Sequence, residues 1–182
     1  PAAALRLIED HGIDAAEAKA SALESLGRFA EAAQALEGVE SPTATLHRVQ
    51  LLANRLGQTE DAVAAVEALL KRDPENVDAV RTLERLGTSL RDPKLTGWAR
   101  RKLAELLRDD KVLRARWLAR AAALCGEPAE ALGFLVEARE LDPGSESIAV
   151  GLAEVHERVE DPASAAAIYE DLAGRSNQLA DR

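Results

Sequence analysis

Aromatic residues, cysteine and long apolar runs are all scarce in this sequence of 182 residues. It contains two Phe, one Tyr and two Trp, against 37 Ala and 27 Leu. Strands favour aromatic and β-branched side chains, whereas Ala and Leu are the best helix formers, so this balance predicts an all-helical chain. No apolar run exceeds five residues. A membrane-spanning helix needs about 18 or more, and we therefore expect no membrane insertion.

Methionine is absent, and the chain begins at Pro1. We interpret the sequence as part of a longer protein, and since it contains no recognisable targeting segment, the compartment stays open. The single cysteine, Cys125, has no second cysteine with which to form an internal disulfide. Its apolar neighbours in the sequence favour a buried structural thiol. The excess of Arg (18) over Lys (5), together with the abundant Ala, suggests a bacterial source.

Motifs that carry catalysis or hold a metal ion are also missing. The three histidines, His11, His47 and His156, are far apart, and no His-Glu-x-x-His or Cys-x-x-Cys pattern occurs. No Gly-x-Ser-x-Gly motif offers a nucleophile, and the scattered glycines form no phosphate-binding loop. We therefore expect a protein that is not an enzyme and needs no cofactor or metal ion.

Glycine and proline recur at a fixed distance along the chain. Pro74 follows Gly57 at the same spacing at which Pro143 follows Gly126, and the two glycines are two periods apart. A second set of prolines, each preceded by an acidic residue, recurs once per period: Pro93, Pro128 and Pro162. Two sets that share a period of about 34 residues indicate a repeat architecture.

Each set of residues predicts a boundary between helices. Gly57 and Gly126 are expected to end helices in a left-handed conformation, which is free of steric cost for glycine. Proline after an acidic residue is expected to begin the second helix of each pair, because Pro fits the first helical turn and the acid favours the helix dipole. The other two prolines are expected in the links between pairs. Apolar residues between these boundaries recur at helical spacing, as in Leu132, Leu135, Ala138 and Leu141.

The unit around residues 112–145 resembles the tetratricopeptide repeat family, whose repeat is about 34 residues long. In that family, small residues occupy the eighth, twentieth and twenty-seventh places and proline the thirty-second. Here those places carry Ala119, Ala131, Ala138 and Pro143. The resemblance implies an all-α, right-handed α-α superhelix of about five antiparallel helix hairpins, the first incomplete. It covers a single domain of repeats at 1–12 (partial), 13–42, 43–76, 77–111, 112–145 and 146–179, and the hairpin at 13–42 has a second helix about one turn short.

The resemblance is weakest in the repeat at 77–111, where Glu84 and Thr96 replace small residues; Gln50 does so in the repeat before it. Pentatricopeptide units share this period and bind RNA, but the net charge of −9 argues against a nucleic-acid partner. The resemblance places His156 where the family often has a buried Tyr, so His156 is expected to lie in or near the core. Trp98 and Trp117 are expected to pack between hairpins. The alternative is that they bind a partner, because Trp is enriched at binding hot spots.

Positive charge is concentrated in residues 78–120, which contain twelve Lys or Arg and six Asp or Glu. The resemblance implies that the first helices of successive repeats line a concave groove, with their fifth and ninth places facing it. Those places carry His47, Arg81, Arg85, Arg116 and Arg120. The arginines of each pair are four residues apart and so share a helical face. Because guanidinium groups match carboxylates and phosphates, we expect the groove to bind an anionic group. The alternative is that the arginines are solvated or pair with acids such as Glu84 and Glu105.

Together these features imply a non-catalytic scaffold for protein–protein interaction that binds a peptide or protein segment in the groove, with an acidic segment favoured. The family's carboxylate-clamp type uses Asn at a ninth place, where this chain has other residues: Leu51, Arg85, Arg120 and Glu154. Binding of a C-terminal carboxylate in that manner is therefore not implied. Two alternatives stay open. One is a regulatory or assembly module of a larger enzyme or of an envelope or secretion protein, and the other is a domain that self-associates.

Overall fold

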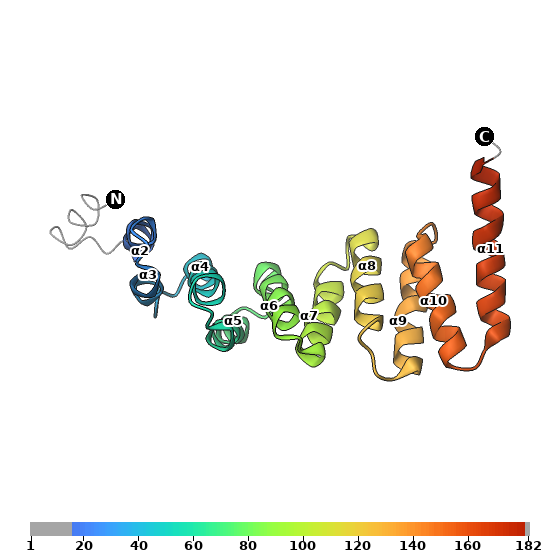
Figure 1. Ribbon diagram of the computed structural model, residues 1–182, viewed down its shortest axis with the longest axis horizontal. Helices are drawn as coiled ribbons and strands as arrows, with labels where there is room; N and C mark the ends of the chain where they lie inside the picture. Colours follow the sequence, from blue (N-terminus) through green and yellow to red (C-terminus); the bar gives the residue numbers. More distant parts are fainter. Residues whose placement is uncertain (1–15, 181–182) are drawn as a thin grey trace. The chain divides into compact units, whose positions relative to one another are not determined.

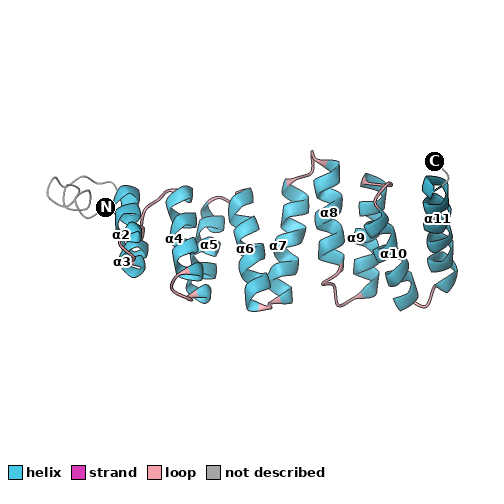
Figure 2. Cartoon of the chain, turned by 45° about the horizontal axis from the view of Figure 1, so that its top comes forward, coloured by secondary structure: helices cyan, strands magenta, loops and turns pink. Residues whose placement is uncertain are grey.

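The structure is a computed structural model that describes residues 16–180, with the side chains of residues 16–175. This described part of the chain folds into ten helices and no strand, which confirms the predicted all-α class (Figures 1 and 2). The chain divides into two compact units, residues 1–91 and 92–182. The predicted partial repeat at residues 1–12, together with His11, lies outside the described residues.

The first unit contains helices α2 (Ala16–Ser25), α3 (Phe29–Ala35), α4 (Pro42–Asn54), α5 (Thr59–Arg72) and α6 (Val77–Leu90). Consecutive helices pack against each other, α2 on α3, α3 on α4, α4 on α5 and α5 on α6. Helices α4 and α6, which are first helices of successive repeats, are also in contact. First helices of neighbouring repeats therefore lie side by side in this unit.

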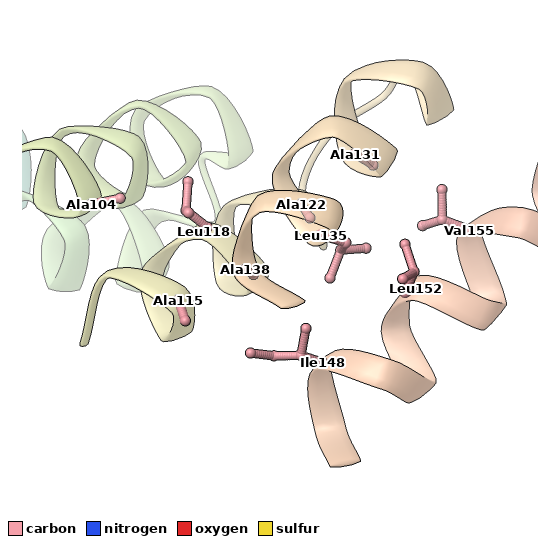
Figure 3. Close-up of a cluster of buried hydrophobic side chains, with 10 residues drawn as sticks. All are labelled: Ala104, Ala115, Leu118, Ala122, Ala131, Leu135, Ala138, Ile148, Leu152 and Val155. Atoms are coloured by element: carbon pink, nitrogen blue, oxygen red, sulfur yellow. The ribbon is translucent and has the colours of Figure 1, made fainter. Parts of the chain in front are cut away.

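The second unit contains helices α7 (Pro93–Leu106), α8 (Lys111–Ala122), α9 (Pro128–Leu141), α10 (Glu146–Arg158) and α11 (Pro162–Ala180). Here too each helix packs on the next, and the first helices α8 and α10 are in contact. Four helices contribute to a core of small and branched side chains (Figure 3): Ala104, Ala115, Leu118, Ala122, Ala131, Leu135, Ala138, Ile148, Leu152 and Val155.

The helix starts predicted from proline are confirmed, since Pro93, Pro128 and Pro162 are the first residues of α7, α9 and α11. The acidic residue before the proline closes the helix end at two of these sites. Asp92 Oδ1 accepts hydrogen bonds of 2.9 and 3.0 Å from two backbone amides of α7. Asp161 Oδ1 accepts a bond of 3.2 Å from the backbone amide of Ser164 in α11. These N-cap bonds pair amides that have no partner within the helix.

Small residues at the places typical of the repeat are buried where helices pack. Ala62, Ala131 and Ala138 are 0% exposed, which is expected where two helix axes approach to about 8 Å. Thr96 stands at such a place in α7 and is also buried. Its hydroxyl donates a 2.7 Å hydrogen bond to the carbonyl of Asp92. Because that bond pairs the polar group within its own helix, threonine is tolerated in the apolar contact.

The turns between paired helices follow the prediction only in part. Gly57 has a φ of +69°, as expected for a left-handed residue that follows a helix. The prediction was wrong for Gly126, which is not among the glycines of positive φ. Helix α8 ends in a tighter turn, in which the amides of Leu124 and Cys125 donate to carbonyls three residues earlier, at 3.0 and 3.1 Å. A turn closed in this way needs no left-handed residue.

The short helix α3 departs further from the repeat than the sequence indicated. It has 7 residues, whereas α5, the corresponding helix of the next repeat, has 14. The difference amounts to about two helical turns and not the one turn predicted. Gly38, three residues after the end of α3, has a φ of +75°, and this left-handed residue turns the chain toward α4.

Two charged residues occupy turn positions where the repeat period would place a glycine. Arg91 lies one period after Gly57, Glu160 lies one period after Gly126, and their φ values are +56° and +60°. A left-handed conformation costs residues other than glycine about 1–2 kcal/mol. We expect Glu160→Gly to raise the free energy of unfolding by about 0.5–1 kcal/mol, since glycine relieves this strain but loses more backbone entropy on folding.

Chemical denaturation followed by circular dichroism measures this effect. The matched control is Glu154→Gly, which introduces the same change at an exposed position inside α10. It is expected to lower the free energy of unfolding by about 0.5–1 kcal/mol. Equal losses in both variants would show that the left-handed backbone at Glu160 carries no strain.

Candidate functional site: the face of the first helices

The five predicted groove residues lie on first helices, as their places in the repeat implied. Three belong to the first unit, His47 on α4 and Arg81 and Arg85 on α6. The other two, Arg116 and Arg120, lie on α8 of the second unit. The two sets therefore belong to different compact units of the chain.

His47 is held by a neighbouring first helix. Its Nε2 atom lies 2.8 Å from Oε2 of Glu24 on α2, and both side chains are partly buried. The contact joins α2 to α4 and becomes an ion pair when the histidine is protonated. His47 therefore has a partner inside the protein, and it contributes less to any binding surface than its place in the repeat suggested.

The two arginines of α6 differ in their surroundings. Arg81 Nη1 lies 3.7 Å from Oδ1 of Asp78, one turn earlier on the same exposed helix face. Exposed pairs of this kind contribute little, typically below about 1 kcal/mol, and they leave the guanidinium open to other partners. Arg85 is exposed and makes no ion pair within the residues that the structure describes. Instead it borders a pocket.

This pocket has a volume of about 200 Å³ and lies between α4 and α6. We call it the α4–α6 pocket. Its apolar lining comes from Val49, Ala53 and Leu86. Its polar lining consists of two amides, three hydroxyls and one guanidinium: Gln50, Asn54, Thr59, Thr82, Ser89 and Arg85. No carboxylate lines the pocket, so its only formal charge is positive. Gln50 contributes because it stands where the repeat usually has a small residue.

The two arginines of α8 are exposed, and neither makes an ion pair within the described part of the chain. The guanidinium carbon of Arg120 lies 4.9 Å from the ring centroid of Trp117, one turn earlier on the helix. A cation–π contact of this kind orients a guanidinium without neutralising it. Glu105, named above as an alternative partner, pairs with Lys102 at 3.1 Å instead.

Other arginines of the second unit are neutralised by carboxylates on neighbouring helices. Arg101 on α7 lies 3.1 Å from Glu130 on α9, and Arg114 on α8 pairs with Glu137 on α9. Both acids lie outside residues 78–120, so the positive excess counted along that segment overstates the free charge there. The pairs join residues 29 and 23 positions apart, a separation at which the sequence pattern alone indicates no contact.

Cys125 is half-buried, not fully buried as expected, and donates a 3.5 Å hydrogen bond from Sγ to the carbonyl of Ala121. Burial raises the pKa of its thiol above the ordinary value, and the nearby Glu130 carboxylate raises the pKa further. Because the thiolate is the reactive form, this environment disfavours nucleophilic chemistry.

Within the described residues, no three His, Cys, Asp or Glu side chains are grouped so that they could hold a metal ion. No helix there is long and apolar enough to cross a membrane.

Three further predictions concerned the core. Trp117 packs against the core cluster of the second unit, as predicted. The His156 side chain is 16% exposed and lies 3.2 Å from Asp161 through Nδ1, so its predicted position near the core is confirmed. Trp98 differs, since it is 42% exposed. Its side chain lies on the side of α7 opposite to the face that carries the buried residues, such as Thr96 and Leu103.

Several solved structures are similar to this chain. MamA (41-end) from Desulfovibrio magneticus RS-1 is 18% identical with a TM-score of 0.58, and the match covers 90% of this chain and 94% of that one. YrrB, described as a TPR protein with an unusual peptide-binding site, is 20% identical with a TM-score of 0.60 over 91% of this chain and 88% of its own. BtubC from P. vanneervenii is 17% identical with a TM-score of 0.56 over 98% and 87%.

No family model matches the sequence, and no curated protein sequence matches it significantly. At these low identities the structural matches inform on the fold alone. The helical hairpins, the buried small residues and the likeness to YrrB agree with the resemblance found in the sequence. The chain has a helical-repeat fold of the tetratricopeptide type.

Proposed function

We propose that this chain is a non-catalytic interaction scaffold whose first helices bind an acidic peptide or protein segment. The observation that carries the proposal concerns three of the four arginines at groove places. Arg85, Arg116 and Arg120 are exposed at groove places and make no ion pair within the described residues. Arg101 and Arg114, which lie elsewhere on the helices, are neutralised by carboxylates. Exposed cations without an internal partner are able to pair with charges on another molecule.

An acidic peptide fits this surface better than a nucleic acid does. The chain carries a net charge of −9, so a long polyanion is repelled by most of its surface. A short acidic segment needs only a local match to a few arginines. Guanidinium groups bind carboxylates through paired hydrogen bonds, and they attract the partner before contact.

Selection of random 12-residue peptides displayed on phage against the folded chain tests this function. We expect the enriched peptides to carry Asp or Glu and to bind the Arg116→Glu/Arg120→Glu variant at least about tenfold more weakly, because two attractive charges become repulsive. The control is Lys71→Glu/Arg72→Glu, which changes the net charge equally in the last turn of the second helix α5. It is expected to change affinity by no more than about twofold.

Two results would contradict the proposal. One is a selection that enriches no peptide. The other is equal binding by the arginine variant, the control variant and the original chain, which would mean that the charge of the first-helix face takes no part in recognition.

A further inference from the structure

We propose that the α4–α6 pocket is a subsite for one carboxylate side chain, Asp or Glu, of a peptide bound in an extended conformation. The inference rests on the proposed function and deepens it, because it assigns a position to a single acidic residue of the partner. It rests on the lining of the pocket, all of which belongs to the first unit.

The charge of the pocket selects an anion. Arg85 supplies the only charged group in the lining, and it has no ion-pair partner within the described residues. Thr59 and Ser89 add hydroxyl donors to the lining. The apolar surface of Val49 and Leu86 offers contact for the methylene groups that precede a side-chain carboxylate. A charged end beside a short apolar stem is the shape of a Glu or Asp side chain.

The charge of the pocket also favours a carboxylate over a phosphate. A phosphorylated side chain carries about −1.5 to −2 charges and is usually bound by a cluster of arginines. This pocket contains a single arginine, Arg85. The hydroxyl of Thr82 is already used, since it donates a 2.8 Å hydrogen bond to the carbonyl of Asp78. A single guanidinium matches a single negative charge.

The two amides of the lining favour an extended peptide. Gln50 and Asn54 are four residues apart on α4 and both border the pocket, so they lie on the same helical face. Both residues are exposed, and neither side chain makes a hydrogen bond within the described part of the chain. Each amide offers a donor and an acceptor. An extended peptide has unpaired main-chain N–H and C=O groups that match this pair, whereas a helical peptide uses most of its own.

The test uses two short peptides as probes, acetyl-Ala-Ala-Glu-Ala-Ala-amide and its counterpart with Gln in place of Glu. Binding to the ¹⁵N-labelled full chain is followed by NMR through the side-chain signals of Gln50, Asn54 and Arg85. We expect the Glu peptide to shift these signals and to bind at least about tenfold more tightly than the Gln peptide, as hydrogen bonds to charged groups imply. Arg85→Gln should abolish that difference.

Arg72→Gln is the matched control, because Arg72 is an exposed arginine of the first unit, at the end of α5, and does not line the pocket. It should leave the preference for the Glu peptide within about twofold. The subsite would be refuted if neither peptide shifts these signals, if both bind equally, or if Arg85→Gln keeps the preference. Tighter binding of a phosphoserine version would refute the choice of a carboxylate. If the library selection succeeds while this test fails, the proposed function stands and only the subsite is lost.

Discussion

Replacing Leu135 with alanine is expected to lower the free energy of unfolding by about 3–4 kcal/mol. Leu135 is 4% exposed and lies in the core cluster formed by α7, α8, α9 and α10 (Figure 3). Truncation of a buried leucine costs about 2–5 kcal/mol, and the cost rises with the volume of the void that remains. We place the effect above the lower end of this range because of the surroundings of the side chain.

On the side that faces α10, one neighbour of Leu135 has no side chain with which to fill the void. Gly151 lies opposite, and a Cβ atom built there would stand 3.4 Å from Cδ2 of Leu135. Because glycine has no side chain, it cannot fill the space that Leu135 leaves beside it. A single domain of this size has a total stability of about 5–15 kcal/mol, so the variant should lose a large part of it.

Denaturant unfolding followed by helical circular dichroism measures the loss. Val136→Ala is the control, since Val136 is the next residue of α9 and is 43% exposed. It should change stability by no more than about 0.5 kcal/mol. A repeat protein can unfold in stages, so the midpoints of the two variants are compared only if their transitions have the same slope. A loss below about 1 kcal/mol for Leu135→Ala would show that α9 and α10 do not pack as described.

The second large effect is expected from the opposite change, Ala131→Leu. Ala131 is 0% exposed, lies in the first turn of α9 and belongs to the same core cluster. A leucine there adds three carbon atoms to a contact that has no room for them. Overpacking of this kind typically costs about 1–3 kcal/mol, and we expect the upper part of the range because the alanine is completely enclosed.

Ala129→Leu is the matched control for this change, because Ala129 lies two residues earlier on α9 and is exposed. The two variants have the same composition and differ only in where the leucine lies. Thermal unfolding should show a clearly lower melting temperature for Ala131→Leu. For Ala129→Leu, the free energy of unfolding should change by no more than about 0.5 kcal/mol. If both variants melt together, small size at this place is not required by the packing of the hairpins.

How much of the candidate site could be predicted depended on how far apart along the chain its residues lie. The helical face that carries Arg85 could be predicted, because spacing along one helix sets which residues share a face. The α4–α6 pocket could not. It is formed by residues from three helices, and its depth depends on how closely α4 and α6 approach. Gln50, a departure from the repeat in the sequence, was the one local sign that this position is unusual.

The helices and their starts were determined by the sequence itself. Proline after an acidic residue begins a helix through local geometry and local hydrogen bonds, and Asp92 acts within three residues of its own position. The period and the small residues Ala62, Ala131 and Ala138 could also be predicted from the sequence, because a repeated unit meets the same neighbour each time. The physical reason is that a helix cap acts within one turn of backbone, and that repetition makes the contact between neighbouring helices recur at a fixed spacing.

Only the tertiary structure decided which charges are free and which turns need a left-handed residue. The carboxylates of Glu130 and Glu137 reach arginines on other helices, so the basic excess read along the sequence is partly neutralised in space. Gly126 has an ordinary conformation while Glu160 is left-handed, since the packing of each hairpin sets its turn. Charge pairing and turn geometry depend on distances between helices, and those distances result from side-chain packing that no single segment specifies.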